Sequence, residues 1–333
     1  MHELLSGALG QLWLGTPIWM WLAFLGIVIA LLALDLGVVH REQREIGVRE
    51  SLMLSGVYIA LGLAFGGGVW WLLGPEAGAA YVTGFVVEKS LAMDNVFVIA
   101  MIFSYFAIPR LYQHRVLFWG ILGVIVLRGI MIGAGATLVA EFSWLLYVFA
   151  AFLVFTGIKM WLSAEEDYSV GDSRVLRFVR RHVRVTETLH GDHFWVRQVD
   201  PKTGRRALYM TPLMLTLLMV EFADVIFAVD SVPAIFAITT DPFIVYTSNI
   251  FAILGLRALY FALAAMVHRF HYLKYALSVL LVFIGSKIFI ADLVDMPGGK
   301  FPPAWSLGIS FAILGAGVAY SLWKTRNETH AVP

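Results

Sequence analysis

The sequence EKSLAMDN, residues 88–95, lies inside an apolar segment, and DVIFAVDS, residues 224–231, lies inside another. In both stretches two carboxylates stand six residues apart, and an oxygen-bearing polar side chain follows the second. A carboxylate is costly in hydrocarbon, so an acid inside a lipid-length apolar segment indicates a functional site. Because the pattern occurs twice, we expect one site to be shared between two halves of the chain.

The composition is that of an integral membrane protein. Of 333 residues, 60% are hydrophobic and 14% are charged, whereas ordinary soluble domains contain about 25% charged residues. The chain has no cysteine, which excludes disulfides, thiol redox chemistry and thiolate metal sites. The N-terminus lacks the basic region of a secretory signal, so we expect the first apolar stretch to remain as a membrane span.

The apolar stretches predict an all-α, polytopic membrane helix bundle. A helix needs roughly 20 apolar residues to cross a bilayer, and backbone groups in lipid must be paired internally. We predict nine spans, at residues 17–39, 52–73, 81–108, 116–140, 142–162, 213–239, 243–267, 273–294 and 304–323.

The distribution of basic residues predicts the orientation of these spans. Of the 24 Lys and Arg residues, those outside the expected spans fall on one side of the membrane, with Lys300 as the exception. Cytoplasmic loops are enriched in Lys and Arg. We therefore expect the N-terminus outside and the C-terminus in the cytoplasm.

Further matches predict an inverted repeat. Arg128 in the fourth span corresponds to Arg257 in the seventh, and FLVFTGIK, residues 152–159, corresponds to LLVFIGSK, residues 280–287. Spans 3–5 then repeat as spans 6–8, and an odd number of spans forces the second copy to enter from the opposite face. Inverted repeats with a site near the midplane are typical of secondary transporters. We expect five units along the chain. They are two N-terminal spans (1–80), the first repeat (81–162), a cytoplasmic loop (163–211), the second repeat (212–295), and a last span with a tail (296–333).

The intramembrane polar residues predict a site for a hard divalent cation. The oxygen donors are Glu88, Asp94, Asn95, Glu221, Asp224, Asp230 and Ser231, with Asp35 and Asn249 as accessory candidates. Oxygen-rich sites suit Mg²⁺, Ca²⁺ and Mn²⁺. The intramembrane bases, which we expect to balance the charge of these acids when no metal is bound, are Arg128, Lys159, Arg257 and Lys287. Purely structural pairing between these acids and bases is the alternative.

Helical geometry constrains which donors meet. At about 100° per residue, Asp224 and Ser231 share a face, whereas Asp230 points elsewhere unless the helix is broken. Pro233 removes a backbone donor in this span, and we expect a kink or break there that frees carbonyl ligands.

The loop at residues 163–211 is too long for a simple turn and predicts a small subdomain or an amphipathic segment. Four of its basic residues are three or four positions apart, as on one face of a helix: Arg174, Arg177, Arg181 and Arg184. This spacing predicts a helix that lies against anionic headgroups. A solvated linker is the alternative.

The chain resembles the TerC/Alx family of bacterial integral membrane proteins, and its arrangement and length are closest to the Alx branch. The resemblance rests on EKSLAMDNVFV at residues 88–98, VEFADVIFAVDSVPAIFAITTDPFIV at 220–245, and TSNIFAILGLR at 247–257. The chain departs from the family pattern at Phe222-Ala223, where Leu-Ser or Leu-Thr is usual. This departure leaves the carboxylates in place.

The resemblance implies export of Mn²⁺ from the cytoplasm across the bacterial inner membrane, with pH-linked regulation. We predict no prosthetic group and no enzymatic activity, with Mn²⁺ as the transported substrate. The predicted partners are the metal ion, the lipid bilayer and coupling protons, with no nucleic acid. Two other functions stay open: a scaffold that acts through the basic loop, and an intramembrane redox modulator. The chain lacks a G-x-x-x-x-G-K-[ST] nucleotide-binding loop, so ATP would have to act through a partner.

Overall fold

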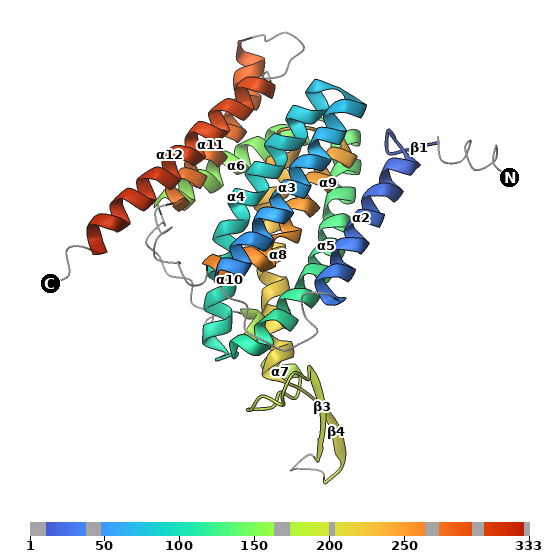
Figure 1. Cartoon of the computed structure of the whole chain (residues 1–333), viewed down its shortest axis with the longest axis vertical. Coiled ribbons are helices and arrows are strands. Elements are labelled where there is room, and N and C mark those ends of the chain that lie inside the picture. The colour runs from blue at the N-terminus through green and yellow to red at the C-terminus, as the bar shows by residue number, and fades with distance from the viewer. Residues whose placement is uncertain are drawn as a thin grey trace.

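The computed structural model describes residues 11–37, 48–162, 174–199, 204–263, 273–294 and 303–329. These residues form a bundle of long helices with a small β-hairpin projecting from one end (Figure 1). The helices before this hairpin are α2 (Ile18–Gly37), α3 (Val48–Leu73), α4 (Pro75–Tyr105), α5 (Arg110–Glu141), α6 (Leu145–Leu162) and α7 (Arg174–His182). The helices after it are α8 (Pro212–Phe236), α9 (Pro242–Leu254), α10 (Leu256–Leu263), α11 (Leu273–Leu293) and α12 (Pro303–Thr329).

The strands form two small antiparallel pairs. Strands β1 (Leu12–Trp13) and β2 (Thr16–Pro17) precede α2. Strands β3 (Trp195–Val199) and β4 (Arg206–Met210) form the projecting hairpin, in which Trp195 lies opposite Met210.

Local sequence determines where two central helices begin. Proline occupies the first turn of α8 and of α9, where its missing N–H costs no helical hydrogen bond. The residue before each proline caps the helix. Asp241 Oδ1 accepts from the N–H of Phe243 at 2.9 Å, and Thr211 Oγ1 accepts from the N–H of Met214 at 3.4 Å.

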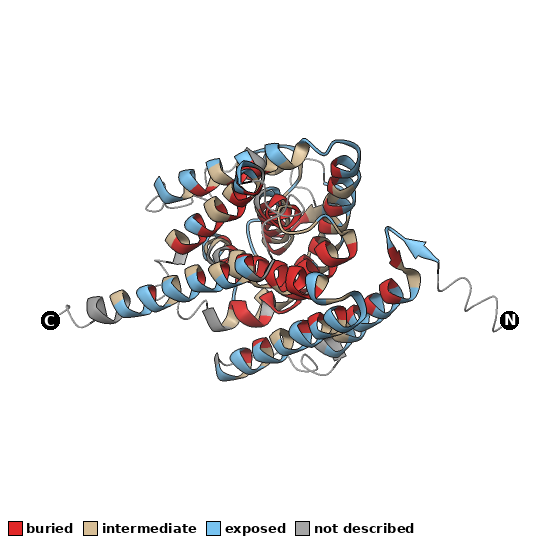
Figure 2. Cartoon of the chain, turned by 90° about the horizontal axis from the view of Figure 1, so that it is seen from above, coloured by how far each residue is buried: buried red, intermediate tan, exposed pale blue. Residues whose placement is uncertain are grey.

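Burial separates central from peripheral helices. The outward faces of the peripheral helices are exposed, whereas the middle of the bundle is buried (Figure 2). Several large apolar side chains are highly exposed, such as Trp71 at 84% and Leu293 at 88%. Such a surface suits contact with lipid rather than water.

Seven helices among the described residues are long and apolar enough to cross a membrane. Each of the nine expected stretches coincides with a described helix, or with the pair α9 and α10 for residues 243–267. The helix α4 is not among the seven, and the apolar part of α2, Ile18–Leu34, is shorter. The chain is therefore a multi-pass helical protein, and the number nine stays a prediction.

The helices α6 and α11, which carry the two matching segments, pack closely through glycines. A Cβ at Gly157 would lie 2.8 Å from the carbonyl oxygen of Ser278, and one at Gly285 would lie 2.5 Å from that of Ala150. Gly285 stands 128 residues after Gly157, and Ser278 stands 128 residues after Ala150. The two contacts are therefore reciprocal and place the two helices antiparallel.

The helical breaks differ from the expectation. The helix α8 continues past Pro233 to Phe236, and α4 continues through residues 94–95, so neither acidic helix is broken at its motif. Pro233 lies in the last turn, where the loss of one donor interrupts little of the helix. The chain instead breaks at Gly255, between α9 and α10.

The segment before α8 contains the expected helix, α7, which ends at His182 and leaves Arg184 outside it. Among the described residues that follow α7, a connection leads to the hairpin, and Asp192 in this connection contacts the bundle. Arg115 on α5 forms an ion pair with Asp192, and its guanidinium lies 5.3 Å from the centre of the Phe194 ring. Thr211, the cap of α8, also donates to the carbonyl of His193 at 2.7 Å.

Candidate polar site at the centre of the bundle

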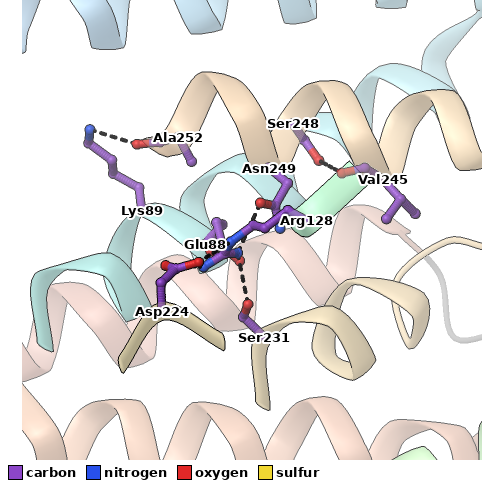
Figure 3. A network of polar contacts seen from close by, with 9 residues as sticks. All are labelled: Glu88, Lys89, Arg128, Asp224, Ser231, Val245, Ser248, Asn249 and Ala252. Carbon is purple, nitrogen blue, oxygen red and sulfur yellow. Dashed lines mark hydrogen bonds and ion pairs between the residues drawn. The ribbon is translucent and has the colours of Figure 1, made fainter. Parts of the chain in front are cut away.

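Arg128 on α5 is the centre of a buried polar cluster. Its side chain is 1% exposed. It donates to oxygen atoms from three other helices: Glu88 on α4, Asp224 and Ser231 on α8, and Asn249 on α9 (Figure 3). The cluster therefore brings together residues from both proposed halves of the chain.

The geometry differs between the partners. Nη1 of Arg128 donates to a carboxylate oxygen of Glu88, to Ser231 Oγ at 3.0 Å and to Asn249 Oδ1 at 2.9 Å. Nη2 donates to Asp224 Oδ1 at 3.2 Å, and Nε donates to Asp224 Oδ2 at 3.4 Å. Asp224 is thus held by two guanidinium nitrogens, an arrangement that orients the carboxylate.

The helices place these groups as the sequence spacing predicts. Asp224 and Ser231 are seven residues apart, or about two turns, and both face Arg128. On α4, Glu88 contacts Arg128, and the buried Asn95 lines a cavity together with Asp224. Each acidic motif therefore contributes its first carboxylate to the cluster, while its neutral oxygen-bearing residue contacts Arg128 in α8 (Ser231) and lines the adjoining cavity in α4 (Asn95).

Several polar atoms of the site have no hydrogen-bond partner among the described residues. They are Glu88 Oε2, Glu221 Oε2 and Asn249 Nδ2, all buried. An unsatisfied buried acceptor is costly, so two free carboxylate oxygens favour the arrival of a cation.

Glu221 lies beside the cluster, against α5. A Cβ at Gly123 would overlap the carboxyl atoms of Glu221, so only glycine leaves room for this carboxylate there. Gly120, one turn earlier, is also near the carboxylate. In the described part of the chain Glu221 forms no ion pair, unlike Glu88 and Asp224.

A cavity of about 30 Å³ adjoins this site, enough for about one water molecule. Its lining includes Asn95, Asp224, Gly120, Ile253 and Leu256. Within the described residues there is no group of three or more His, Cys, Asp or Glu side chains arranged to hold a metal ion. The side chains of Asp94 and Asp230, which the sequence adds to the site, lie outside the described part of the chain, as do those of Asp35 and Arg257.

The two lysines expected to balance these acids lie elsewhere. Lys159 is exposed on α6, and Lys287 on α11 is buried and donates to Ser306 Oγ on α12 at 3.1 Å. The structure therefore brings neither lysine to the Arg128 cluster, and of the described bases expected there, Arg128 alone contacts its carboxylates. Spacing within a repeat fixes the position of a residue along its helix, but not the helix that it faces.

Lys287 instead lines a second cavity of about 500 Å³. Acidic and hydroxyl-bearing residues around it include Glu76, Ser143, Thr240 and Asp241. Glu76 lies in the first turn of α4, and the others lie in the connections between α5 and α6 and between α8 and α9. The structure thus gathers connections that we expect outside the membrane at one end of the bundle.

A polar contact that sequence reasoning missed involves Lys89, next to Glu88. Its ammonium Nζ donates to the carbonyl oxygen of Ala252, in the last turn of α9, at 3.0 Å (Figure 3). The signals available in the sequence were a glycine in the middle of an apolar span, Gly255, and a lysine beside an intramembrane glutamate.

Comparisons with known proteins agree on the class. The model of the integral membrane protein TerC family matches residues 73–329. STKORF319, an uncharacterized membrane protein of Myxococcus xanthus, is 49% identical over 92% of this chain and 93% of its own length. Proteins of Salmonella typhi and Escherichia coli (strain K12) are each 48% identical, over 94% and 93% of this chain and 97% and 95% of their own lengths. Both carry the provisional name membrane-bound redox modulator Alx. None of these descriptions states a catalytic activity, and no solved structure matches the chain.

Proposed function

Because this chain belongs to the integral membrane protein TerC family, we propose that it exports a divalent metal cation, Mn²⁺, from the cytoplasm. The family resemblance indicates the metal, and the residues supply the binding chemistry. One observation carries it: carboxylates and neutral oxygens from α4, α8 and α9 converge on a single buried guanidinium.

The charge of this cluster favours a cationic substrate. When ionised, Glu88 and Asp224 carry two negative charges against the one positive charge of Arg128, so these three described side chains then have an excess of one negative charge. Glu221, with no ion pair among the described residues, adds another negative charge when ionised. A buried negative charge without compensation is strongly unfavourable, and a doubly charged ion provides the compensation.

Arg128 acts in this proposal as the counter-ion of the empty site. When the metal binds, it takes over the carboxylate oxygens that the guanidinium holds, and Asn95, Ser231 and Asn249 supply neutral oxygen ligands. Hard oxygen donors of this kind suit Mn²⁺ as they suit Mg²⁺ and Ca²⁺. Asp94 and Asp230 complete the proposed set of carboxylates, and protons are the proposed coupling ion.

The proposed transport cycle uses two inverted halves. The reciprocal contacts between α6 and α11 support a twofold relation between the repeats. In the cluster, Glu88 lies near Ser231, whereas Asn95 lies near Asp224, so α4 and α8 are also paired antiparallel. We propose nine spans in the inner membrane, with the N-terminus outside and the hairpin in the cytoplasm.

Purified protein in proteoliposomes tests this function directly. We expect Mn²⁺ flux in the wild type and its loss in Glu88→Gln and Asp224→Asn, which remove one charge each at nearly constant volume. Glu141→Gln, at the exposed end of α5, is the matched control for a carboxylate-to-amide change. Equal Mn²⁺ flux through all four proteins would contradict the site assignment. Competition of Mg²⁺, Ca²⁺ and Zn²⁺ with Mn²⁺ would measure the selectivity of the site among these ions.

The provisional name of the relatives makes redox modulation the second candidate. This chain has no cysteine, so such a role excludes thiol chemistry within it. A redox titration of the purified protein that shows electron uptake, together with absent Mn²⁺ flux, would favour this second function.

A further inference from the structure

The buried span formed by α9 and α10 is interrupted at a single residue. The helix α9 ends at Leu254, Gly255 follows, and α10 begins at Leu256. The Gly255 N–H donates to the carbonyl of Ile253, and helical bonding resumes where the N–H of Leu259 donates to the carbonyl of Gly255. At such an end the last carbonyls lose their helical donors and together carry partial negative charge.

The ammonium of Lys89 fills the place of one lost donor. Its Nζ lies 3.0 Å from the Ala252 carbonyl oxygen, which in an unbroken helix would accept from the N–H of Leu256. Lys89 is buried, with 7% of its surface exposed. In the described part of the chain it forms no ion pair with a carboxylate, although Glu88 precedes it directly.

The space between this ammonium and the break is narrow. A Cβ at Gly255 would lie 2.7 Å from Lys89 Nζ and 3.0 Å from the Cβ of Tyr58 on α3. With the Lys89 ammonium in its present place, only glycine fits at the break without a shift, because a Cβ would compete with the ammonium for the same space. A buried cation, a backbone carbonyl and a glycine that leaves room for both form a built site.

The break also forms one wall of the candidate metal site. Ile253 and Leu256, on either side of Gly255, line the cavity beside Asn95 and Asp224. Glu88, which contacts Arg128, and Lys89, which contacts Ala252, are adjacent on α4. The same turn of α4 therefore joins the acidic cluster to the broken span.

We propose that the break between α9 and α10 is a subsite for a monovalent, ammonium-like cation, and that the side chain of Lys89 is its tethered occupant. Lys89 holds the two half-helices in the position that shapes the Asp224 cavity. It is thus a positioning residue, and its effect on metal transport rests on the proposed function. The subsite itself does not, since it follows from the contacts of Lys89, Ala252 and Gly255 alone.

Chemical rescue tests the subsite. The variant Lys89→Ala removes the ammonium and leaves its space, and its thermal stability is measured in detergent for the full chain. We expect a Tm below that of the wild type, with recovery by about 2–4 °C in ammonium chloride, because a ligand that binds only the folded state raises Tm. Tetramethylammonium chloride at the same ionic strength is too large for the space and is expected to give no recovery.

Three controls make the result specific. Lys89→Met removes the charge but fills the space, so ammonium is expected to leave its Tm unchanged. The wild type, whose subsite is occupied, and Lys159→Ala, which removes an exposed lysine, are also expected not to respond. If Lys89→Ala does not fold, Lys89→Ser leaves a similar space and replaces it in the same comparison.

Equal Tm values in ammonium and tetramethylammonium for the Lys89→Ala or Lys89→Ser protein would overturn the proposal, as would an equal ammonium response in Lys89→Met. The outcome is independent of the transport assay. Absent Mn²⁺ flux in the wild type would refute the proposed function while a specific ammonium response still established the subsite.

Discussion

Arg128 on α5 and Glu88 on α4 form an ion pair in which each side chain is only 1% exposed. Burial of such a pair removes two ions from water, and their attraction offsets this cost only while both partners are present. Arg128 also compensates Asp224, so a single guanidinium stabilises two buried carboxylates. Its removal and its replacement by a metal ion are therefore the most direct tests of the site.

The variant Arg128→Met is expected to be destabilised by roughly 3–5 kcal/mol, because it leaves Glu88 and Asp224 buried without their cation. If the metal replaces the guanidinium, added Mn²⁺ should raise the Tm of this variant more than that of the wild type. Thermal unfolding in detergent with and without Mn²⁺ measures both effects. The double variant Arg128→Met/Glu88→Gln, with less negative charge, should gain less from Mn²⁺. A Tm unaffected by Mn²⁺ in Arg128→Met would contradict the exchange of counter-ions.

The variant Gly123→Ala tests the position of Glu221. The added methyl group occupies the space of the Glu221 carboxylate, which must then move away from α5. We expect weaker Mn²⁺ binding with a small change in stability, measured by calorimetric titration and thermal unfolding. Gly133→Ala, on the same helix with open space around it, is the matched control and should bind Mn²⁺ as the wild type does. Unchanged affinity in Gly123→Ala would argue against Glu221 as part of the site.

The reciprocal packing of α6 and α11 predicts similar costs for two distant substitutions. Gly157→Ala and Gly285→Ala each place a methyl group against the backbone of the other helix, and overpacking of this kind costs about 1–3 kcal/mol. Gly133→Ala should be neutral or stabilising, since alanine has the higher helix propensity. Thermal unfolding of the three variants measures the comparison. A large loss in one of the two α6–α11 variants, with none in the other, would argue against the proposed twofold relation between the repeats.

Shortening the hairpin tests whether the protein acts as a transporter or as a scaffold. Replacing residues 196–209 by a short turn removes most of β3 and β4 and keeps Asp192, Met210 and Thr211, which contact the bundle or cap α8. We expect Mn²⁺ flux in proteoliposomes to persist, because the Arg128 cluster lies in the helices. The partly exposed Arg115–Asp192 pair contributes less than about 1 kcal/mol, so Asp192→Asn should likewise remain active. Loss of flux in the shortened chain, with normal thermal stability, would instead give the hairpin a direct role.

The sequence predicted the groups of the site better than the breaks in the helices. Asp224 and Ser231 meet Arg128 because a spacing of seven residues is about two helical turns, a local property. Asn249 was predicted only as accessory, since its contact with Arg128 depends on how α9 packs against α5. The expected break at Pro233 is absent, and the break at Gly255 lies beside a carbonyl that accepts a hydrogen bond from a lysine on another helix. Long-range packing of this kind leaves no periodic signal in a single sequence.

The buried Lys287 and the exposed Lys159 occupy matching positions in the two proposed repeats, so they form a matched pair of test sites. Lys287 lines the cavity of about 500 Å³ together with Glu76 and Asp241, so its positive charge opposes a cation held there. In Lys287→Met this cavity becomes more negative, and we expect Mn²⁺ to bind more tightly from that end and to be released more slowly. Flux measured with Mn²⁺ on either side of the vesicle should then show a lower KM and a lower maximal rate from the side of Asp241. Lys159→Met removes the corresponding charge at the lipid-facing surface and should leave both values unchanged. Identical kinetics of Lys287→Met and the wild type would show that this cavity is not on the path of the ion.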